Sequence, residues 1–318
     1  MMTSKEITQR AITFTGPPRI PLTYCNRDFE YSDVLCAGYA PARTFYPMAS
    51  GMTEWGYCWH SLDGTMGQPH SQPLVADAAI ASYCPPDPYA SGRLDGLSGW
   101  IQENQDKYLR FGLGISGFNQ ATFLRGFEPF LMDLSSDSTQ ADHVLDIVFD
   151  FENSIIDQAV TFDIDAVTFA DDWGTQHGLM IAPACWRETF RPRYAEQFAR
   201  IHQAGKKVWF HTCGDVWTII GDLLDIGVDV LELLQPDLFG VERLAAEFGG
   251  HVCFCCAVDH QRRAVCGSRE EIFAYTQLLA DSLGKYHGGF IGYLEDYASL
   301  GMTAENYQWI RQAFHRLA

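Results

Sequence analysis

His211 and Cys213 are the two side chains whose types and spacing most directly suggest chemistry. They lie in the stretch FHTCGDV (210–216), after a short apolar run and directly before Gly214. In a strand, residues two apart face the same side, and a glycine lets the backbone turn. Imidazole and thiolate are good Zn²⁺ ligands, and a catalytic zinc usually has three protein ligands and one open position. The pair therefore predicts part of a zinc site, the alternative being two buried structural residues.

The segments that would position this pair alternate between strand-like and helix-like patterns. Five apolar or β-branched runs in the second half of the chain are each followed by a segment with helical periodicity. The strand-like runs are 163–174, 206–215, 228–236, 251–259 and 288–296, and the helix-like segments are 186–207, 216–227, 238–250, 268–284 and 304–318. Successive strand–helix units predict parallel strands joined by crossover helices.

The first half of the chain is less regular. Residues 17–25 and 111–118 are typical of strands, and residues 141–162 are typical of a long helix. Residues 45–95 are rich in glycine, proline and aromatic residues, which indicates an elaborated loop region within the same domain. No Gly-x-Gly-x-x-Gly motif follows a strand, which argues against a dinucleotide site.

The strand count is near eight, so we predict an α/β fold of the (β/α)8 TIM barrel class, with one domain over residues 1–318. Active sites of such barrels lie at the carboxyl ends of the strands. His211 and Cys213 end a predicted strand and would therefore lie at this face, which we call the barrel mouth.

Composition excludes several classes of partner. Forty acidic and 22 basic side chains give a net charge of −18, which would repel the phosphate backbone of nucleic acid. No apolar run reaches the length of about 18 residues that a membrane span needs, and the amino terminus is polar. We therefore expect a cytoplasmic protein with no nucleic-acid or membrane partner. The ten dispersed cysteines should be mostly reduced.

Segments along essentially the whole chain resemble the uroporphyrinogen decarboxylase superfamily, in the expected order. They are TSKEITQRAITFTGPPRIPL (3–22), EWGYCW (54–59), LRGFEPFLMDL (124–134), ADDWGTQHGLMIAP (170–183), HQAGKKVWFHTCGDV (202–216), GVDVLELLQP (227–236), GGFIG (288–292) and TAEN (303–306). The resemblance implies a (β/α)8 barrel, in agreement with the strand–helix pattern.

Two features of the sequence favour one branch of this superfamily. True decarboxylases carry an RQAGR segment that grips the substrate's carboxylates, and it is absent from the corresponding residues 24–44. An acidic tetrapyrrole would also suit so negative a chain poorly. The His-x-Cys-Gly at 211–214 resembles instead the zinc-dependent, corrinoid-linked methyltransferases. This resemblance implies Zn²⁺ at the site and a cobalamin carried by a partner corrinoid protein.

The third zinc ligand departs from the pattern of that branch. Its members place a second cysteine after the last strand, where this chain has Glu295 and Asp296. We predict Glu295 as the ligand, with Asp296 as its near rival. Cys256 is the alternative, because it lies nearer the strand end than Cys253 or Cys255.

An oxygen ligand in place of sulfur would leave the zinc more electrophilic and suited to an ether or alcohol oxygen. The resemblance then implies transfer of a methyl group from a small O-methyl substrate, an ether or methylated alcohol, to cob(I)alamin. The alternatives are transfer from the corrinoid to a thiol or pterin, a metal-free decarboxylase-like lyase, and an idle barrel that only binds corrinoid proteins.

Further residues are candidates for substrate contacts. Asp172 and Gln176 form a pair similar to the family's, which would orient the substrate or stabilise the leaving group, the alternative being to cap a short helix beginning near Trp173. Glu54 and Trp55, in EWG, and Trp173 are predicted to line the substrate pocket, although large aromatic residues more often belong to the core.

Overall fold

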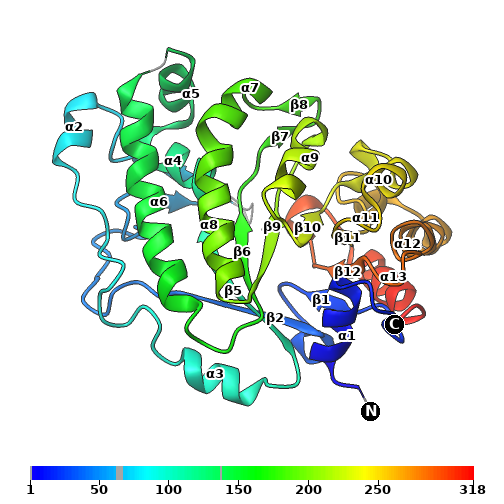
Figure 1. The fold of residues 1–318 in the computed structure, drawn as a ribbon. Coiled ribbons are helices and arrows are strands. Elements are labelled where there is room, and N and C mark those ends of the chain that lie inside the picture. Colours follow the sequence, from blue (N-terminus) through cyan, green and yellow to red (C-terminus); the bar gives the residue numbers. More distant parts are fainter. Residues whose placement is uncertain (1, 62–66, 137) are drawn as a thin grey trace.

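The computed structural model describes residues 2–61, 67–136 and 138–318, and its centre is a closed barrel of eight parallel strands (Figure 1). In chain order these strands are β1 (Leu22–Tyr24), β2 (Val34–Gly38), β5 (Tyr108–Ile115), β6 (Ala166–Ala170), β9 (Lys207–His211), β10 (Val230–Leu233), β11 (Cys253–Ala257) and β12 (Phe290–Leu294). Each strand pairs with the next, and β12 pairs with β1 to close the ring. The predicted (β/α)8 barrel is confirmed.

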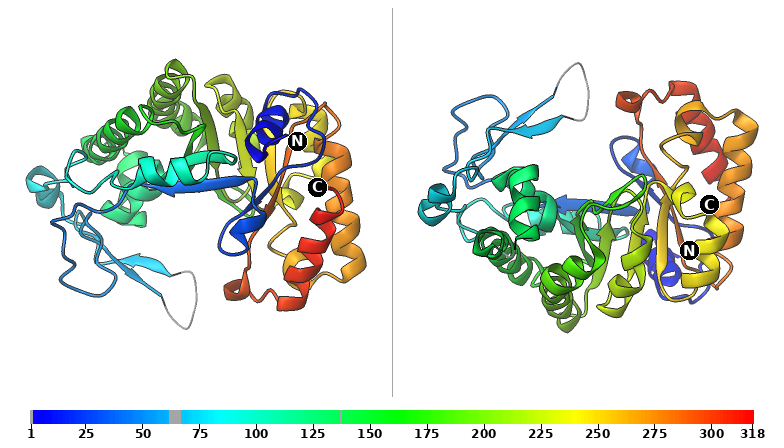
Figure 2. Two further views of the ribbon diagram at one scale, coloured as in Figure 1. Left: turned by 90° about the horizontal axis from the view of Figure 1, so that it is seen from below. Right: turned by 90° about the horizontal axis from the view of Figure 1, so that it is seen from above.

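Helices surround the strands, as the views from below and from above show (Figure 2). They are α1 (Ser4–Ile12), α2 (Asp77–Ser82), α3 (Leu97–Glu103), α4 (Gly117–Arg125), α5 (Phe127–Ser135), α6 (Thr139–Ala159), α7 (Pro183–Cys185), α8 (Arg191–Gln203), α9 (Trp217–Asp225), α10 (Val241–Phe248), α11 (Arg263–Cys266), α12 (Arg269–Leu283) and α13 (Ala304–His315). The long helix expected over 141–162 is α6. No helix in the described part of the chain is long and apolar enough to span a membrane.

Strand β9, which ends at His211, is buried on both of its faces. Val208, Trp209 and Phe210 are fully buried, as expected for a parallel strand covered by helices outside and by side chains inside the barrel. The ring of Phe210 packs against Tyr194 of α8, with 5.5 Å between the ring centroids. This apolar run therefore fixes the position at which the strand ends, and with it the position of His211.

The structure differs from the sequence-based expectations in three segments. Strand β2 was not recognised, because its five residues VLCAG carry no clear alternation. The region 45–95 contains α2 and a hairpin of β3 (Cys58–His60) and β4 (Gln68–His70), which projects from the ring of helices (Figure 2). Residues 62–66 of that region lie outside the described residues.

The third difference concerns the residues after Trp173, where a short helix was the alternative expectation. A short hairpin of β7 (Gly174–Thr175) and β8 (Gly178–Leu179) stands there instead. It packs directly on the turn after β9, since a Cβ atom on Gly174 would lie 2.5 Å from the carbonyl carbon of Gly214. Gly214 also has a φ of +79°, a conformation that favours glycine. The glycine of FHTCGDV thus allows a close backbone contact as well as a turn.

Two buried carboxyl groups hold the start of α4 against the barrel. Glu152 of α6 accepts a hydrogen bond from the backbone of Gly117 (2.7 Å) and another from Gln197 (2.9 Å). Asp171, fully buried at the end of β6, accepts hydrogen bonds from the backbone of Phe118 and Asn119 and from Tyr194. Burial raises the pKa of Glu152 to about 7, and that of Asp171 well above its usual value.

The raised pKa of Glu152 predicts a specific pH dependence of stability. Between the unfolded value near 4.5 and the folded value near 7, the folded state binds more protons, so the free energy of unfolding falls as pH rises. The contribution of this group is on the order of 3 kcal/mol. Urea unfolding at pH 5 and pH 8 should therefore show a smaller loss of stability in Glu152→Gln than in the unmodified chain. An equal loss in both proteins would contradict this account.

Candidate active site and metal centre

Asp172, His211 and Cys213 meet at the barrel mouth, at the ends of β6 and β9. Their ligand atoms all lie within 4.8 Å of one another, and each residue is partly buried. The Nε2 atom of His211 lies 3.6 Å from Sγ of Cys213 and 3.5 Å from Oδ1 of Asp172. In a tetrahedral zinc site with bonds of about 2.0–2.3 Å, ligand atoms are separated by roughly 3.3–3.8 Å. These three side chains therefore fit zinc in both chemistry and spacing.

Backbone contacts between the ends of the two strands bring the three residues together. Ala170 pairs with His211 in the barrel ladder, and the backbone N–H of Asp171 donates to the carbonyl of His211 (3.1 Å). The backbone N–H of Cys213 donates to Oδ1 of Asp172 (2.8 Å). Asp171 and Asp172 consequently point in opposite directions, the first to α4 and the second into the mouth.

Glu232 orients the imidazole of His211. It lies beside His211 in the ladder between β9 and β10, and its Oε1 is 3.0 Å from Nδ1 of His211. Its Oε2 accepts hydrogen bonds from Nη1 of Arg110 (3.0 Å) and Nε1 of Trp209 (2.6 Å). Burial alone would raise the pKa of Glu232, but the hydrogen bond with His211 and the charge of Arg110 lower it to about 2.

An ionised Glu232 accepts a hydrogen bond from the N–H group at Nδ1 and leaves Nε2 free for a metal, which is the usual arrangement around a zinc-binding histidine. Neither Glu232 nor Arg110 was predicted from the sequence. A signal was present, because each is a charged residue within an apolar strand, in VLEL and YLRFGLGI. Charged residues at such positions are rarely buried unless they are paired.

The other predicted ligands lie outside this cluster. Glu295, after β12, accepts hydrogen bonds from the hydroxyl groups of Tyr293 (2.7 Å) and Tyr297. Asp296 forms an ion pair with Arg27 (2.7 Å). Cys256 is fully buried within β11. Among the described residues, the carboxylate that the structure groups with His211 and Cys213 is Asp172, where we had expected Glu295.

Three residues that were predicted to contact the substrate lie in different surroundings. Gln176, in the turn between β7 and β8, is exposed, and its amide donates to the side-chain oxygen of Gln235 (3.2 Å). Trp173 is fully buried and stacks on Phe118 with 4.5 Å between ring centroids, so its ring belongs to the core. Glu54 is held by Arg93, whose Nη2 lies 2.9 Å from Oε1.

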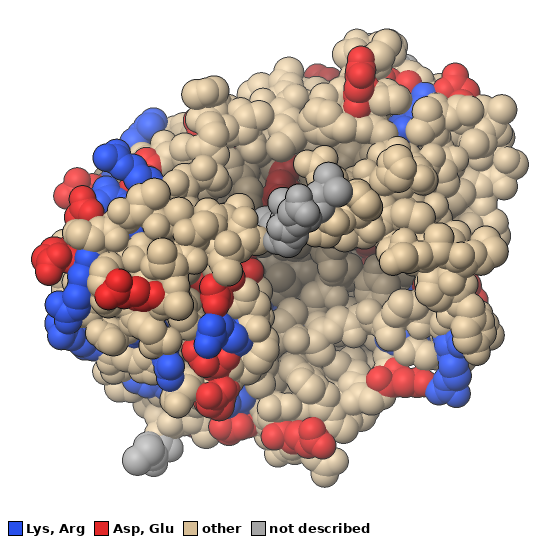
Figure 3. All heavy atoms as spheres, turned by 180° about the vertical axis from the view of Figure 1, so that it is seen from behind, with Lys and Arg blue, Asp and Glu red and all other residues tan. Residues whose placement is uncertain are grey.

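Trp55 lines a cavity of about 420 Å³ at the carboxyl ends of β2 and β5. Tyr39, Phe45, Tyr57 and Gln120 are among the other residues that line it. The rear face of the molecule is hollowed, with mostly uncharged side chains in the walls of the hollow and charged groups at its borders (Figure 3).

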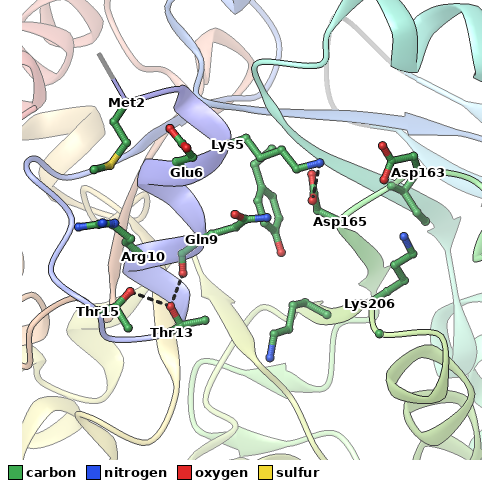
Figure 4. Close-up of a pocket in the computed structure, with 14 residues that line it drawn as sticks. Met2, Lys5, Glu6, Gln9, Arg10, Thr13, Thr15, Asp163, Asp165 and Lys206 are labelled. Carbon is green, nitrogen blue, oxygen red and sulfur yellow. Dashed lines mark hydrogen bonds and ion pairs between the residues drawn. The ribbon is translucent and has the colours of Figure 1, made fainter.

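A larger cavity, of about 740 Å³, lies at the opposite end of the barrel. Its lining includes Lys5, Arg10, Asp165 and Lys206, and Figure 4 shows Lys5 pointing towards Asp165, with which it forms an ion pair of 2.9 Å. The described residues of its lining include neither histidine nor cysteine, and it lies at the amino ends of the strands, where barrel residues usually serve stability. We therefore place the functional site at the mouth.

Comparison with models of protein families tests the resemblance to the uroporphyrinogen decarboxylase superfamily that the sequence segments indicated. A model described as uroporphyrinogen decarboxylase (URO-D) matches residues 65–317, which is most of the chain. The chain belongs to the uroporphyrinogen decarboxylase family. The resemblance inferred from the sequence is thereby confirmed, and the segments 170–183 and 202–216 of this family member carry the Asp172–His211–Cys213 cluster.

Among solved structures, this family member is similar to a methyltransferase from Methanosarcina mazei. The TM-score is 0.70 over 99% of both chains, at 12% sequence identity, so the similarity shows a common fold. Weaker similarities involve D-psicose 3-epimerase (TM-score 0.44, 13% identity, 75% of this chain and 85% of that chain) and a xylose isomerase-like TIM barrel protein from Mycobacterium smegmatis (TM-score 0.39, 14% identity, 69% and 78%). They carry no argument about function. Comparison with curated proteins finds no significant match.

Proposed function

We propose that the chain is a zinc-dependent methyltransferase that moves a methyl group from a small O-methyl substrate to the cob(I)alamin of a corrinoid protein. The observation that carries the proposal is the Asp172–His211–Cys213 cluster at the barrel mouth. The shared fold with a Methanosarcina methyltransferase supports the same branch of the family.

In this proposal Nε2 of His211, Sγ of Cys213 and Oδ1 of Asp172 hold the zinc, and a fourth position faces the substrate. Zinc bound there would act as a Lewis acid on the ether or alcohol oxygen. Only one of the three ligands is a thiolate, which suits an oxygen-containing substrate. Glu232 keeps a proton at Nδ1 of His211 and so prevents the imidazole from rotating.

The charges at the mouth argue against decarboxylation of a tetrapyrrole. A substrate with many carboxylates needs free cationic groups to bind it. Arg110, within the barrel, is paired with Glu232, and Arg93, behind the cavity, is paired with Glu54. Both guanidinium groups are thus already neutralised by carboxylates of the chain.

The proposal predicts how association with the corrinoid partner depends on salt. Because this chain carries a net charge of −18, the partner surface that meets it should be locally basic. Added salt would screen this attraction over a Debye length of about 8 Å at physiological ionic strength. Kinetics across ionic strength should show a rising KM for the corrinoid protein and little change for the small substrate. Equal rates with free and protein-bound cob(I)alamin at every salt level would contradict a specific partner.

A methyl-transfer assay with several donors tests the proposed function. The zinc-loaded protein is incubated with cob(I)alamin and, in turn, methoxylated aromatics, methanol and methylamines, and the absorbance of methylcobalamin is followed. We expect methylcobalamin and a demethylated alcohol or phenol from an O-methyl donor. Methylation of a thiol or pterin from methylcobalamin, with no reaction in the other direction, would reverse the assigned role. Release of CO₂ from uroporphyrinogen by metal-free protein would overturn it.

A further inference from the structure

The cavity of about 420 Å³ lies beside the metal-binding cluster, at the same level of the barrel. Ile115 lines the cavity and pairs with Ala170, which in turn pairs with His211. Adjacent strands are about 4.8 Å apart. The two strand spacings from β5 to β9 therefore place the backbone of Ile115 roughly 10 Å from that of His211. A molecule that occupies the cavity can therefore extend towards the cluster.

The described residues that line this cavity carry no unpaired charge. Glu54 is the only acidic or basic residue among them, and Arg93, itself 2% exposed, binds both of its carboxylate oxygens. The backbone N–H of Ala42 also donates to Glu54 (3.3 Å). Burial raises the pKa of Tyr39, and that of Tyr57 to about 12, so both hydroxyl groups are neutral at physiological pH. The cavity is suited to an uncharged molecule.

Aromatic rings dominate the larger side chains of the lining. Tyr39, Phe45, Trp55 and Tyr57 all contribute, together with Leu113 and other apolar residues. Such rings favour a flat ligand, because aromatic pairs stabilise one another beyond the burial of their surface. The volume falls in the range of roughly 300–1,000 Å³ that is usual for small-molecule sites.

Gln120, which lines the cavity, carries a polar group with no hydrogen-bond partner among the described residues. The residue is 3% exposed, and its Oε1 accepts a hydrogen bond from the hydroxyl of Tyr57 (3.3 Å). Its amide nitrogen, Nε2, is buried without a hydrogen-bond partner among the described residues. A buried donor left unpaired is unfavourable, and an acceptor atom on a ligand would satisfy it once the amide rotates towards the cavity.

We propose that this cavity holds an uncharged aromatic ring of the methyl donor and that Gln120 donates a hydrogen bond to an oxygen on that ring. The inference rests on the proposed function and narrows its substrate to the methyl ethers of hydroxylated aromatic rings. Gln120 then selects rings that carry a second oxygen, while the methyl ether faces the metal-binding cluster.

Binding measurements test this assignment without requiring turnover. Isothermal titration calorimetry compares 4-methoxyphenol, which has a hydroxyl group opposite the ether, with methoxybenzene, which lacks it, and with tetramethylammonium. We expect the unmodified protein to bind 4-methoxyphenol at least about tenfold more tightly than methoxybenzene, since one hydrogen bond to a buried donor is worth about 1–2 kcal/mol. Tetramethylammonium should bind more weakly than either.

The variant Gln120→Met keeps the length of the side chain and removes the donor. It should bind both aromatic probes equally, and a cooperative thermal transition will show that it folds even though the Tyr57 hydroxyl loses its acceptor on Gln120. Gln277→Met, on the surface of α12, is the matched control and should retain the tenfold preference. The inference is overturned if Gln120→Met retains the preference, or if the unmodified protein prefers tetramethylammonium or binds none of the probes. Binding without methyl transfer would overturn only the proposed function.

Discussion

Replacing His211 or Cys213 with alanine should lower the affinity for zinc by about 100-fold or more while leaving the barrel folded. Each substitution removes one of the three proposed ligands, and the affinity of a metal site depends strongly on ligand number. The barrel should persist, because the cluster is only partly buried and lies above the core. Zinc per chain after dialysis against a weak chelator measures the effect, and circular dichroism checks the fold. Full zinc occupancy in both variants would contradict the metal centre.

The third ligand is tested by matched substitutions at the competing positions. Asp172→Ala should lose zinc as His211→Ala does, because Asp172 is the carboxylate beside the other two ligands. Glu295→Ala and Cys256→Ser should keep it, because Glu295 is bonded to two tyrosines and Cys256 is buried in β11. If Glu295→Ala lost zinc and Asp172→Ala retained it, the sequence-based prediction of Glu295 would stand instead.

Replacing Glu232 should give the second large effect, on both stability and metal binding. Glu232→Ala leaves Arg110 buried without its partner, which should cost about 3–5 kcal/mol of stability. Glu232→Gln keeps the shape of the side chain and should destabilise less. It still removes the anionic acceptor at Nδ1 of His211, so zinc affinity should fall by about 10- to 100-fold.

Urea unfolding and competitive chelation measure these two effects separately. Glu270→Gln, on the exposed surface of α12, provides a control that should leave zinc affinity unchanged and lower stability by less than about 1 kcal/mol, the usual contribution of an acidic residue in the first turn of a helix. Unchanged zinc affinity in Glu232→Gln would show that the carboxylate does not orient His211 for metal binding.

The barrel could be predicted from the sequence because its second half repeats one local pattern. Each of the strands β6, β9, β10, β11 and β12 is an apolar run followed by a helix. Few folds other than a parallel α/β sheet or barrel accommodate such a repeat. Strand β2 could not be recognised in the same way, because five residues with no alternating pattern resemble a loop. Its place becomes evident only when β1 and β5 need a strand between them.

The candidate site was predictable only where its residues are close in the chain. His211 and Cys213 are two apart at the end of one strand, so their proximity follows from local geometry. Asp172 joins them through the contact between Gly174 and Gly214, and no local pattern predicts which of two adjacent carboxylates faces inward. Glu232 reaches His211 through the register of β9 and β10, which is also non-local. Glu295 was predicted as a ligand from its place in the family pattern, and in the structure it accepts hydrogen bonds from Tyr293 and Tyr297.

Titration of the metal-free protein with zinc is the most direct test of the central claim, that the Asp172–His211–Cys213 cluster carries a zinc-dependent methyl transfer. The rate of methylcobalamin formation from the best O-methyl donor is measured as zinc is added to chelator-treated protein. We predict a rate that rises in proportion to added zinc, stops rising at about one zinc per chain, and stays at background in His211→Ala. An undiminished rate in the metal-free protein, unaffected by added zinc, would contradict the account.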